Sequence, residues 1–71
     1  MKKKISIEGM SCEHCVNHVT TALEELAGVS KVEVNLAAKN ANIEASQEIS
    51  DEDINAAIDE AGYEVTKIEV L

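Results

Sequence analysis

The apolar residues of this chain follow two different spacings, and the order in which these spacings occur restricts the fold more than any other feature. A period of two residues is typical of a half-buried strand, and spacings of three and four are typical of an amphipathic helix. Period-two stretches occur over about residues 2–8, 31–36 and 41–45, and a last one around Val65, Ile68 and Val70, where Val65 is out of phase with the other two. Helical spacing occurs over about residues 13–26 and 51–61. The predicted order of elements is β-α-β-β-α-β.

This order is that of the ferredoxin-like fold. Each expected helix has one narrow apolar stripe and a charged back, so each must bury one side only. We therefore expect an α+β sandwich in which a four-stranded antiparallel sheet carries both helices on one face. With 71 residues, the chain has room for a single domain, residues 1–71.

Small and polar residues mark the expected ends of these elements. Gly28 is expected to end the first helix, and residues 37–40 to form a hairpin turn. Ser50 and Asp53 resemble a capping box at the start of the second helix, with Asp in place of Glu. Gly62 is expected to adopt a left-handed conformation after that helix.

The charge and the lack of aromatic residues exclude several kinds of partner. Six lysines against fourteen Asp and Glu give a net charge of −8, the wrong sign for binding phosphate groups. Tyr63 is the only aromatic residue, whereas base-stacking surfaces use several. No stretch approaches the ~18 apolar residues of a membrane span. We expect neither nucleic acid binding nor direct membrane binding.

The N-terminal segment and the cysteines bear on location. Lys2, Lys3 and Lys4 resemble the basic start of a signal peptide, but residues 5–9 alternate instead of forming its apolar core. We therefore expect a cytoplasmic protein. Because the cytosol keeps thiols reduced, the two cysteines predict metal binding or redox chemistry and not a structural disulfide.

Both cysteines lie where the first strand gives way to the first helix, in the segment Gly9-Met10-Ser11-Cys12-Glu13-His14-Cys15. Two thiols three residues apart at a helix start can converge on one point. The free N–H groups and the positive end of the helix stabilise thiolates there. A thiolate is both a soft-metal ligand and a nucleophile, so a metal site and a redox dithiol both remain open at this point.

The number of ligands separates the candidate metals. Structural zinc and iron–sulfur sites use about four protein ligands, whereas this chain has two cysteines. Two thiolates suit Cu(I) above all, and low coordination leaves room for a ligand from another protein. This favours a carrier that passes its metal on. Ag(I), Zn(II) and Cd(II) are expected to bind in the test tube, because thiolates accept all three.

Placed in this order of elements, the loop resembles that of the heavy-metal-associated (HMA) domain family, and within it the bacterial copper chaperones. The resemblance covers essentially the whole chain and rests on Gly9, Met10, Cys12, Cys15, Gly28-Val29, Val32-Glu33-Val34-Asn35-Leu36 and Ala61-Gly62-Tyr63. It implies a carrier that binds Cu(I) through Cys12 and Cys15 and passes it to a copper-transporting P-type ATPase. The same fold serves as the metal-binding domain of those ATPases, so an isolated ATPase domain is the alternative. A copper-responsive regulator is a further expected partner.

The resemblance also implies roles for the neighbours of the cysteines. Gly9, Met10 and Ser11 would support the loop, with Met10 as a core residue that anchors it and not as a ligand. Ser11 stands where zinc- and cadmium-type domains often carry Asp, which favours copper. Tyr63 would lie in the neighbouring loop, near the metal.

His14 and His18 are candidate extra ligands. His14 lies between the cysteines and His18 lies three residues after Cys15, so the three side chains can share one helix flank. An exposed helix residue is the ordinary interpretation of each. Our hypothesis is that one of them is a third ligand in a copper-bridged dimer of a chain that is monomeric without metal.

A dithiol oxidoreductase is the main rival from another class, because it also carries Cys-x-x-Cys at a helix start. Thioredoxin-like chains are longer and commonly have aromatic residues and a cis-proline around the thiols, whereas this chain has no proline and no Trp. We therefore expect a binding protein and not an enzyme. A mercury-handling protein would share the fold, but a periplasmic carrier would need a signal peptide. The acidic balance predicts a basic docking face on the acceptor.

Overall fold

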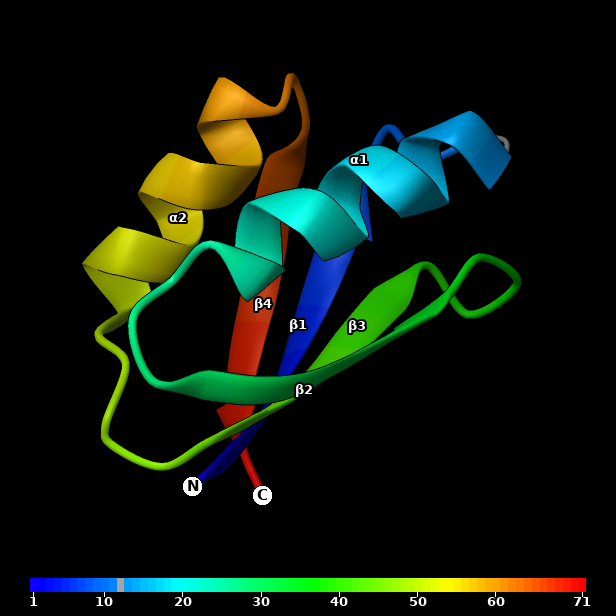
Figure 1. The fold of residues 1–71 in the computed structure, drawn as a ribbon. Helices are drawn as coiled ribbons and strands as arrows, with labels where there is room; N and C mark the ends of the chain where they lie inside the picture. The colour runs from blue at the N-terminus through cyan, green and yellow to red at the C-terminus, as the bar shows by residue number, and fades with distance from the viewer. Residues whose placement is uncertain (12) are drawn as a thin grey trace.

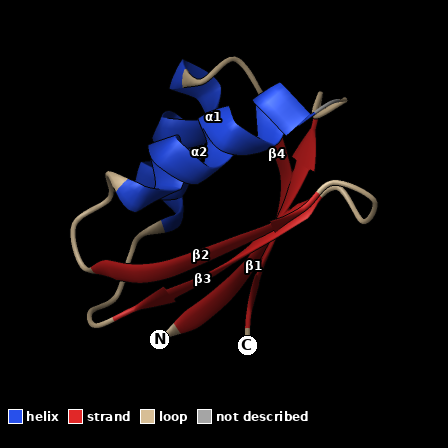
Figure 2. Ribbon diagram, turned by 45° about the vertical axis from the view of Figure 1, so that its right-hand side comes forward, coloured by secondary structure: helices blue, strands red, loops and turns tan. Residues whose placement is uncertain are grey.

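The computed structural model describes residues 1–11 and 13–71, and its elements follow the predicted order. The strands are β1 (Lys2–Glu8), β2 (Val29–Asn35), β3 (Asn40–Ala45) and β4 (Glu64–Val70), and the helices are α1 (Glu13–Glu24) and α2 (Asp51–Glu60). The strands form one antiparallel sheet in the order β2-β3-β1-β4. Both helices cover the same face of this sheet (Figures 1 and 2). The predicted ferredoxin-like sandwich is therefore confirmed.

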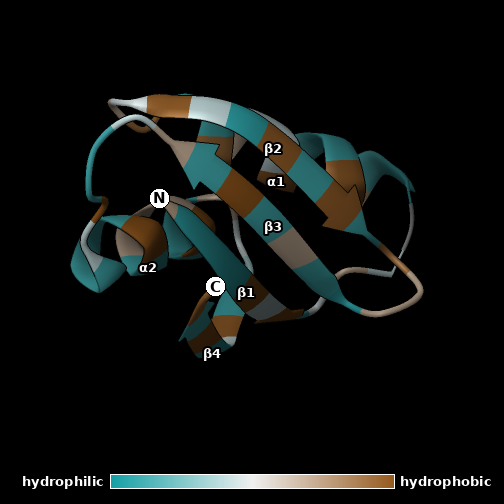
Figure 3. Ribbon diagram, turned by 90° about the horizontal axis from the view of Figure 1, so that it is seen from below, coloured by the Kyte–Doolittle hydropathy of each residue, from teal (hydrophilic) through white to brown (hydrophobic). Residues whose placement is uncertain are grey.

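An aliphatic core fills the space between the helices and the sheet. Ile5 and Ile43 from the central strands meet Leu23 of α1 and Ile58 of α2, and all four are fully buried. Burying each such side chain contributes about 1.5–3 kcal/mol before the cost of ordering the chain. The opposite face of the sheet is open, and hydrophilic residues alternate with apolar ones along its strands (Figure 3).

Helix α1 ends two residues earlier than the apolar spacing predicts. The prediction extended it to residue 26, but the last helical residue is Glu24. The Leu26 N–H then donates to the Leu23 carbonyl at 3.2 Å, which is a tighter, 3₁₀-type turn. Leu26 still packs against the core from this turn. The apolar spacing therefore outlasts the helix, and Gly28 lies in the turn before β2 instead of directly ending α1.

Strand β4 contains an irregularity that explains the phase of its apolar residues. Ser6 of β1 pairs with Lys67, but the next residue, Ile7, pairs with Val65, so Thr66 is an extra residue on β4. The Thr66 hydroxyl donates to the Ser6 carbonyl at 3.3 Å. Because of this bulge, Val65 and Ile68 both pack against the core although they are three residues apart.

Lys3 is a buried residue that the sequence pattern did not single out. It occupies a core-facing position of β1 and is 5% exposed. Its Nζ donates to the Ile49 carbonyl at 2.7 Å and lies 2.9 Å from Asp51 Oδ1. The lysine thus holds the segment before α2 against the sheet, and its charge is paired as a buried charge must be.

Three connections meet at one end of the sheet. Glu8 at the end of β1 pairs with Glu64 at the start of β4, so the β1–α1 and α2–β4 connections are neighbours. The Ile7 N–H donates to the Lys39 carbonyl, which brings the β2–β3 turn to the same end. Both chain termini lie at the other end (Figure 1). Within the described residues, neither helix is long and apolar enough to cross a membrane.

Candidate metal-binding site

The segment that leads into α1 is held by a glycine and a buried methionine. Gly9 has φ +98°, a left-handed value that favours glycine, and a Cβ there would lie 3.4 Å from Tyr63 Cδ1. Met10 is 4% exposed and belongs to the core cluster. Ser11 is exposed. The chain therefore turns away from β1 at Gly9 and is fixed by Met10 just before the cysteine pair.

Cys15 lies in the first turn of α1, which begins at Glu13. It is half-buried and packs against the core cluster. The N–H groups of a first helical turn have no partner within the helix, and the positive end of the helix dipole stabilises a thiolate there. Cys12, the other predicted ligand, lies outside the described residues.

Tyr63 is brought to this loop by the way α2 ends. The Tyr63 N–H donates to the Ile58 carbonyl at 3.0 Å and the Gly62 N–H to the Asp59 carbonyl at 3.0 Å. These two bonds form a Schellman motif, with Gly62 in the left-handed conformation that the sequence predicted, at φ +95°. The half-buried Tyr63 side chain packs on the core and against Gly9. The structure thus places Tyr63 beside the cysteine-bearing loop.

The two histidines are candidate extra ligands, and a contact is described for His18. Both are exposed residues of α1. The Nδ1 atom of His18 lies 3.5 Å from the hydroxyl oxygen of Tyr63, across the gap between α1 and the α2–β4 connection. Sequence reasoning placed His14, Cys15 and His18 on one flank of a helix, but it missed the contact of His18 with Tyr63 because the two residues are 45 positions apart.

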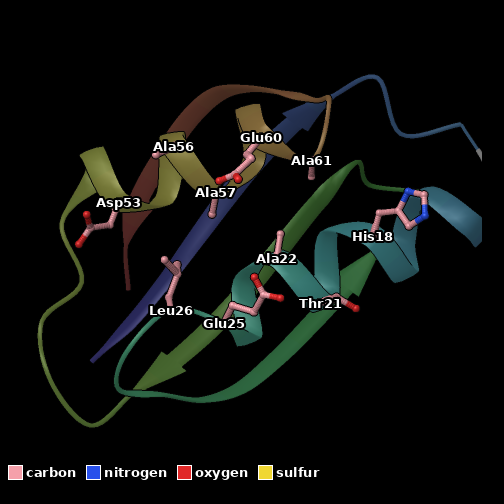
Figure 4. A pocket seen from close by; sticks show the side chains of 10 residues that line it. All are labelled: His18, Thr21, Ala22, Glu25, Leu26, Asp53, Ala56, Ala57, Glu60 and Ala61. Carbon is pink, nitrogen blue, oxygen red and sulfur yellow. The ribbon is translucent and has the colours of Figure 1, made fainter.

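A groove of about 620 Å³ runs between the two helices. Figure 4 shows its lining: alanine side chains come from both helices, and His18 stands at one end. Three carboxylates belong to the lining, namely Glu25 from the turn after α1 and Asp53 and Glu60 from α2. The groove is therefore lined by small and acidic side chains. Its His18 end lies beside Tyr63, which packs against the cysteine loop.

The fold and the loop together define a small ferredoxin-like binding domain with a Cys-x-x-Cys sequence at the start of its first helix. Comparison with known proteins narrows this class. The family model described as "Heavy-metal-associated domain" matches residues 4–64. The chain belongs to that family, as the sequence predicted.

Relatives within the family include both chaperones and ATPases. Copper chaperone CopZ of Bacillus subtilis (strain 168) is 45% identical over 67 residues, which cover 93% of this chain and 97% of the relative. Copper-transporting ATPase 1 of Rhizobium meliloti (strain 1021) is 37% identical over 65 residues, which cover 92% of this chain and 8% of the ATPase. A solved structure described as "CopZ metallochaperone" has a TM-score of 0.86 at 30% identity, covering 93% of this chain and 100% of that one.

The chain is thus similar to CopZ-type copper chaperones and is related to the copper-ATPase metal-binding domains. Chaperones of this family are not enzymes, so the prediction of a binding protein in place of a dithiol oxidoreductase is confirmed.

Proposed function

We propose that this protein binds Cu(I) through Cys12 and Cys15 and delivers it to the metal-binding domain of a copper-transporting P-type ATPase. One observation carries the proposal: the Cys-x-x-Cys sequence stands at the start of α1 in a chain that is 45% identical to a copper chaperone over 93% of its length. Two thiolates are the soft, low-coordinate ligand set that suits Cu(I). The cytoplasmic location expected from the sequence stays a prediction.

Transfer would proceed by exchange of thiolate ligands, without oxidation or reduction. Copper bound to Cys12 and Cys15 would accept a cysteine of the docked partner, form a three-coordinate intermediate, and then lose one chaperone cysteine. Cys15 is half-buried and packed against the core, whereas Cys12 precedes the helix in the sequence. We therefore expect Cys12 to be the first cysteine that the incoming ligand displaces.

An anaerobic titration of the reduced protein with Cu(I) against a competing chelator tests this function. We expect about one Cu(I) per chain to be held tightly, and this binding to be lost when Cys12 and Cys15 are both replaced by serine. A mass near twice 7.6 kDa in the copper-loaded protein would support the copper-bridged dimer. If the variant with both His14→Ala and His18→Ala stays monomeric when loaded, a histidine is a ligand in that dimer. Weak Cu(I) binding with a readily cycled disulfide, or tighter retention of Zn(II), would refute the proposal.

The distribution of charge supports the helix layer as the surface that meets the acceptor. Helix α1 contains two glutamates and α2 contains five carboxylates, and neither helix has a lysine. All six lysines lie on the strands or in the β2–β3 turn. Both helices also lack a basic residue in the last turn, where carboxylates oppose the helix dipole. Carboxylates in such positions do not stabilise the fold, which is consistent with their use in recognition of a basic partner.

Charge-reversal variants test this docking surface. Glu60→Lys changes the groove between the helices, whereas Glu33→Lys makes the same change of net charge on an exposed position of β2. Complementary charges mainly speed association, so we expect Glu60→Lys to slow copper transfer to the ATPase domain about tenfold at low salt and much less at high salt. Equal slowing by Glu33→Lys would show that only the net charge matters and would contradict docking through the helices.

A further inference from the structure

Tyr63 is the point at which three segments around the cysteine loop meet. Its backbone is fixed by the end of α2, its ring lies against Gly9, and its hydroxyl faces His18 of α1. We propose that His18 is a positioning residue for copper release: it holds the Tyr63 ring beside the cysteine loop and so limits the access of outside ligands to the metal. The inference rests on the proposed function for its copper step.

The contact between His18 and Tyr63 runs from α1 to the connection between α2 and β4. The distance of 3.5 Å between His18 Nδ1 and Tyr63 Oη permits a hydrogen bond in either imidazole tautomer, with Tyr63 or the ring N–H as the donor. Because His18 follows Cys15 by one turn of α1, this contact links Tyr63 to the helix that carries a predicted ligand. A displacement of the ring is therefore resisted from the α1 side.

The surroundings of Tyr63 on the other side leave room for such a displacement. Tyr63 lines two hollows, one of about 320 Å³ between α2 and β4 and one of about 590 Å³ beside Glu8, Gly9 and Gly62. The ring also packs on the core, so only the part of it that borders these hollows has space to move into. The contact with His18 opposes movement toward the hollows, and its loss is expected to increase the motion of the ring beside Gly9.

Ligand exchange makes the position of this ring matter. Copper leaves a two-thiolate site only after a third ligand approaches the metal, so a side chain beside the loop controls the rate of that approach. It changes the equilibrium affinity much less, because the two thiolates stay the same. His18 is thus expected to act on the rate of copper loss and not on the strength of copper binding.

Five variants separate this role from a merely structural one. His18→Ala removes the contact, His18→Asn keeps a polar group near the position of Nδ1, and Tyr63→Phe removes the hydroxyl. The double variant His18→Ala, Tyr63→Phe completes a double-mutant cycle. Asn17→Ala is the matched control, because it truncates an exposed polar residue at the adjacent position of α1.

The first measurement is made without copper. Tyr63 is the only aromatic residue, so the intrinsic fluorescence of the chain reports on its ring alone. We expect the fluorescence anisotropy of the metal-free protein to fall in His18→Ala, and to stay at the wild-type value in His18→Asn and Asn17→Ala. Unchanged anisotropy in His18→Ala would overturn the proposal, whatever the protein does with copper.

The second measurement follows the removal of bound Cu(I) by bicinchoninate, a chelator whose copper complex is coloured. Since an exposed hydrogen bond changes an equilibrium by about two- to fivefold, we expect His18→Ala and Tyr63→Phe each to speed removal by about that factor, with the affinity for Cu(I) changed less than about twofold. The double variant is expected to be no faster than either single one. Effects that multiply in the double variant, or a rate that depends on protein concentration as in a histidine-bridged dimer, would overturn the proposal.

If the wild-type protein takes up no Cu(I), the proposed function fails, and the anisotropy still decides whether His18 restrains Tyr63.

Discussion

Replacing Lys3 by methionine tests how a buried lysine is stabilised in this fold. Methionine keeps most of the apolar stem and removes the ammonium group, which donates to the Ile49 carbonyl at 2.7 Å. An unpaired buried carbonyl costs about 1–3 kcal/mol. The ion pair with Asp51 adds less than about 1 kcal/mol, because the Asp51 side chain is 63% exposed and its charge is screened by solvent. We therefore expect Lys3→Met to lower the free energy of unfolding by about 2 kcal/mol.

Urea denaturation of the reduced, metal-free protein, followed by far-ultraviolet circular dichroism, measures this cost. In a chain of this size, about 2 kcal/mol corresponds to a fall in Tm of roughly 10 °C. Lys2→Met is the matched control: its ammonium group lies 3.2 Å from Glu44 but is exposed, so its loss is expected to cost less than about 0.5 kcal/mol.

Asp51→Asn separates the two partners of Lys3. It keeps the carbonyl bond and removes the ion pair and one favourable charge in the first turn of α2, so we expect a cost below about 1 kcal/mol. A cost equal to that of Lys3→Met would refute the reasoning, because the ion pair and not the carbonyl would then be the main partner. A neutral Lys3→Met would refute it as well.

Three further predictions concern the elements that place the site, and each is measured by the same urea denaturation. Leu23→Ala removes a fully buried side chain of α1, so we expect a loss of about 2–5 kcal/mol, and a smaller loss would show that the core collapses around the gap. Ser50→Ala removes the acceptor of the Asp53 N–H at the start of α2, and we expect a loss of about 1 kcal/mol; an unchanged midpoint would show that water replaces the cap. Gly62→Ala places a Cβ at φ +95°, and we expect a loss of about 1–2 kcal/mol, with weakened packing of Tyr63 on Gly9; a neutral result would mean that the turn relaxes.

The sequence predicts local features correctly where short-range chemistry decides the structure. Ser50 starts α2 through its bond from the Asp53 N–H, and Gly62 takes the left-handed conformation after α2, as predicted. The end of α1 was placed at residue 26 and is at Glu24, because Leu26 reaches the core from a tight turn and so extends the apolar spacing beyond the helix. The start of β4 could not be fixed in advance, since the bulge at Thr66 depends on pairing with β1.

The candidate site shows the same division. The identity and spacing of Cys12 and Cys15 are properties of the sequence, and they left a metal site and a redox dithiol open. The number of cysteines and the resemblance over the whole chain then favoured copper and the heavy-metal-associated family. The resemblance implied that Met10 is a core residue and that Tyr63 lies in the neighbouring loop. The structure shows that Met10 is buried and that Tyr63 lies against Gly9. The contact of Tyr63 with His18 and the acidic groove between the helices had no signal in any local pattern.

The sequence by itself determined the order of the elements, the capping of α2, the presence of two closely spaced thiols and the net charge. Periodicity and capping depend on a few neighbouring positions, and residue counts do not depend on the fold at all. Only the tertiary structure decided which residues meet across the fold. Lys3 reaches Ile49 and Asp51 because β1 runs beneath the start of α2, and Tyr63 reaches His18 because the end of α2 lies beside α1. Such meetings depend on how the strands pair and how both helices lie on one sheet, which no local stretch of this chain encodes.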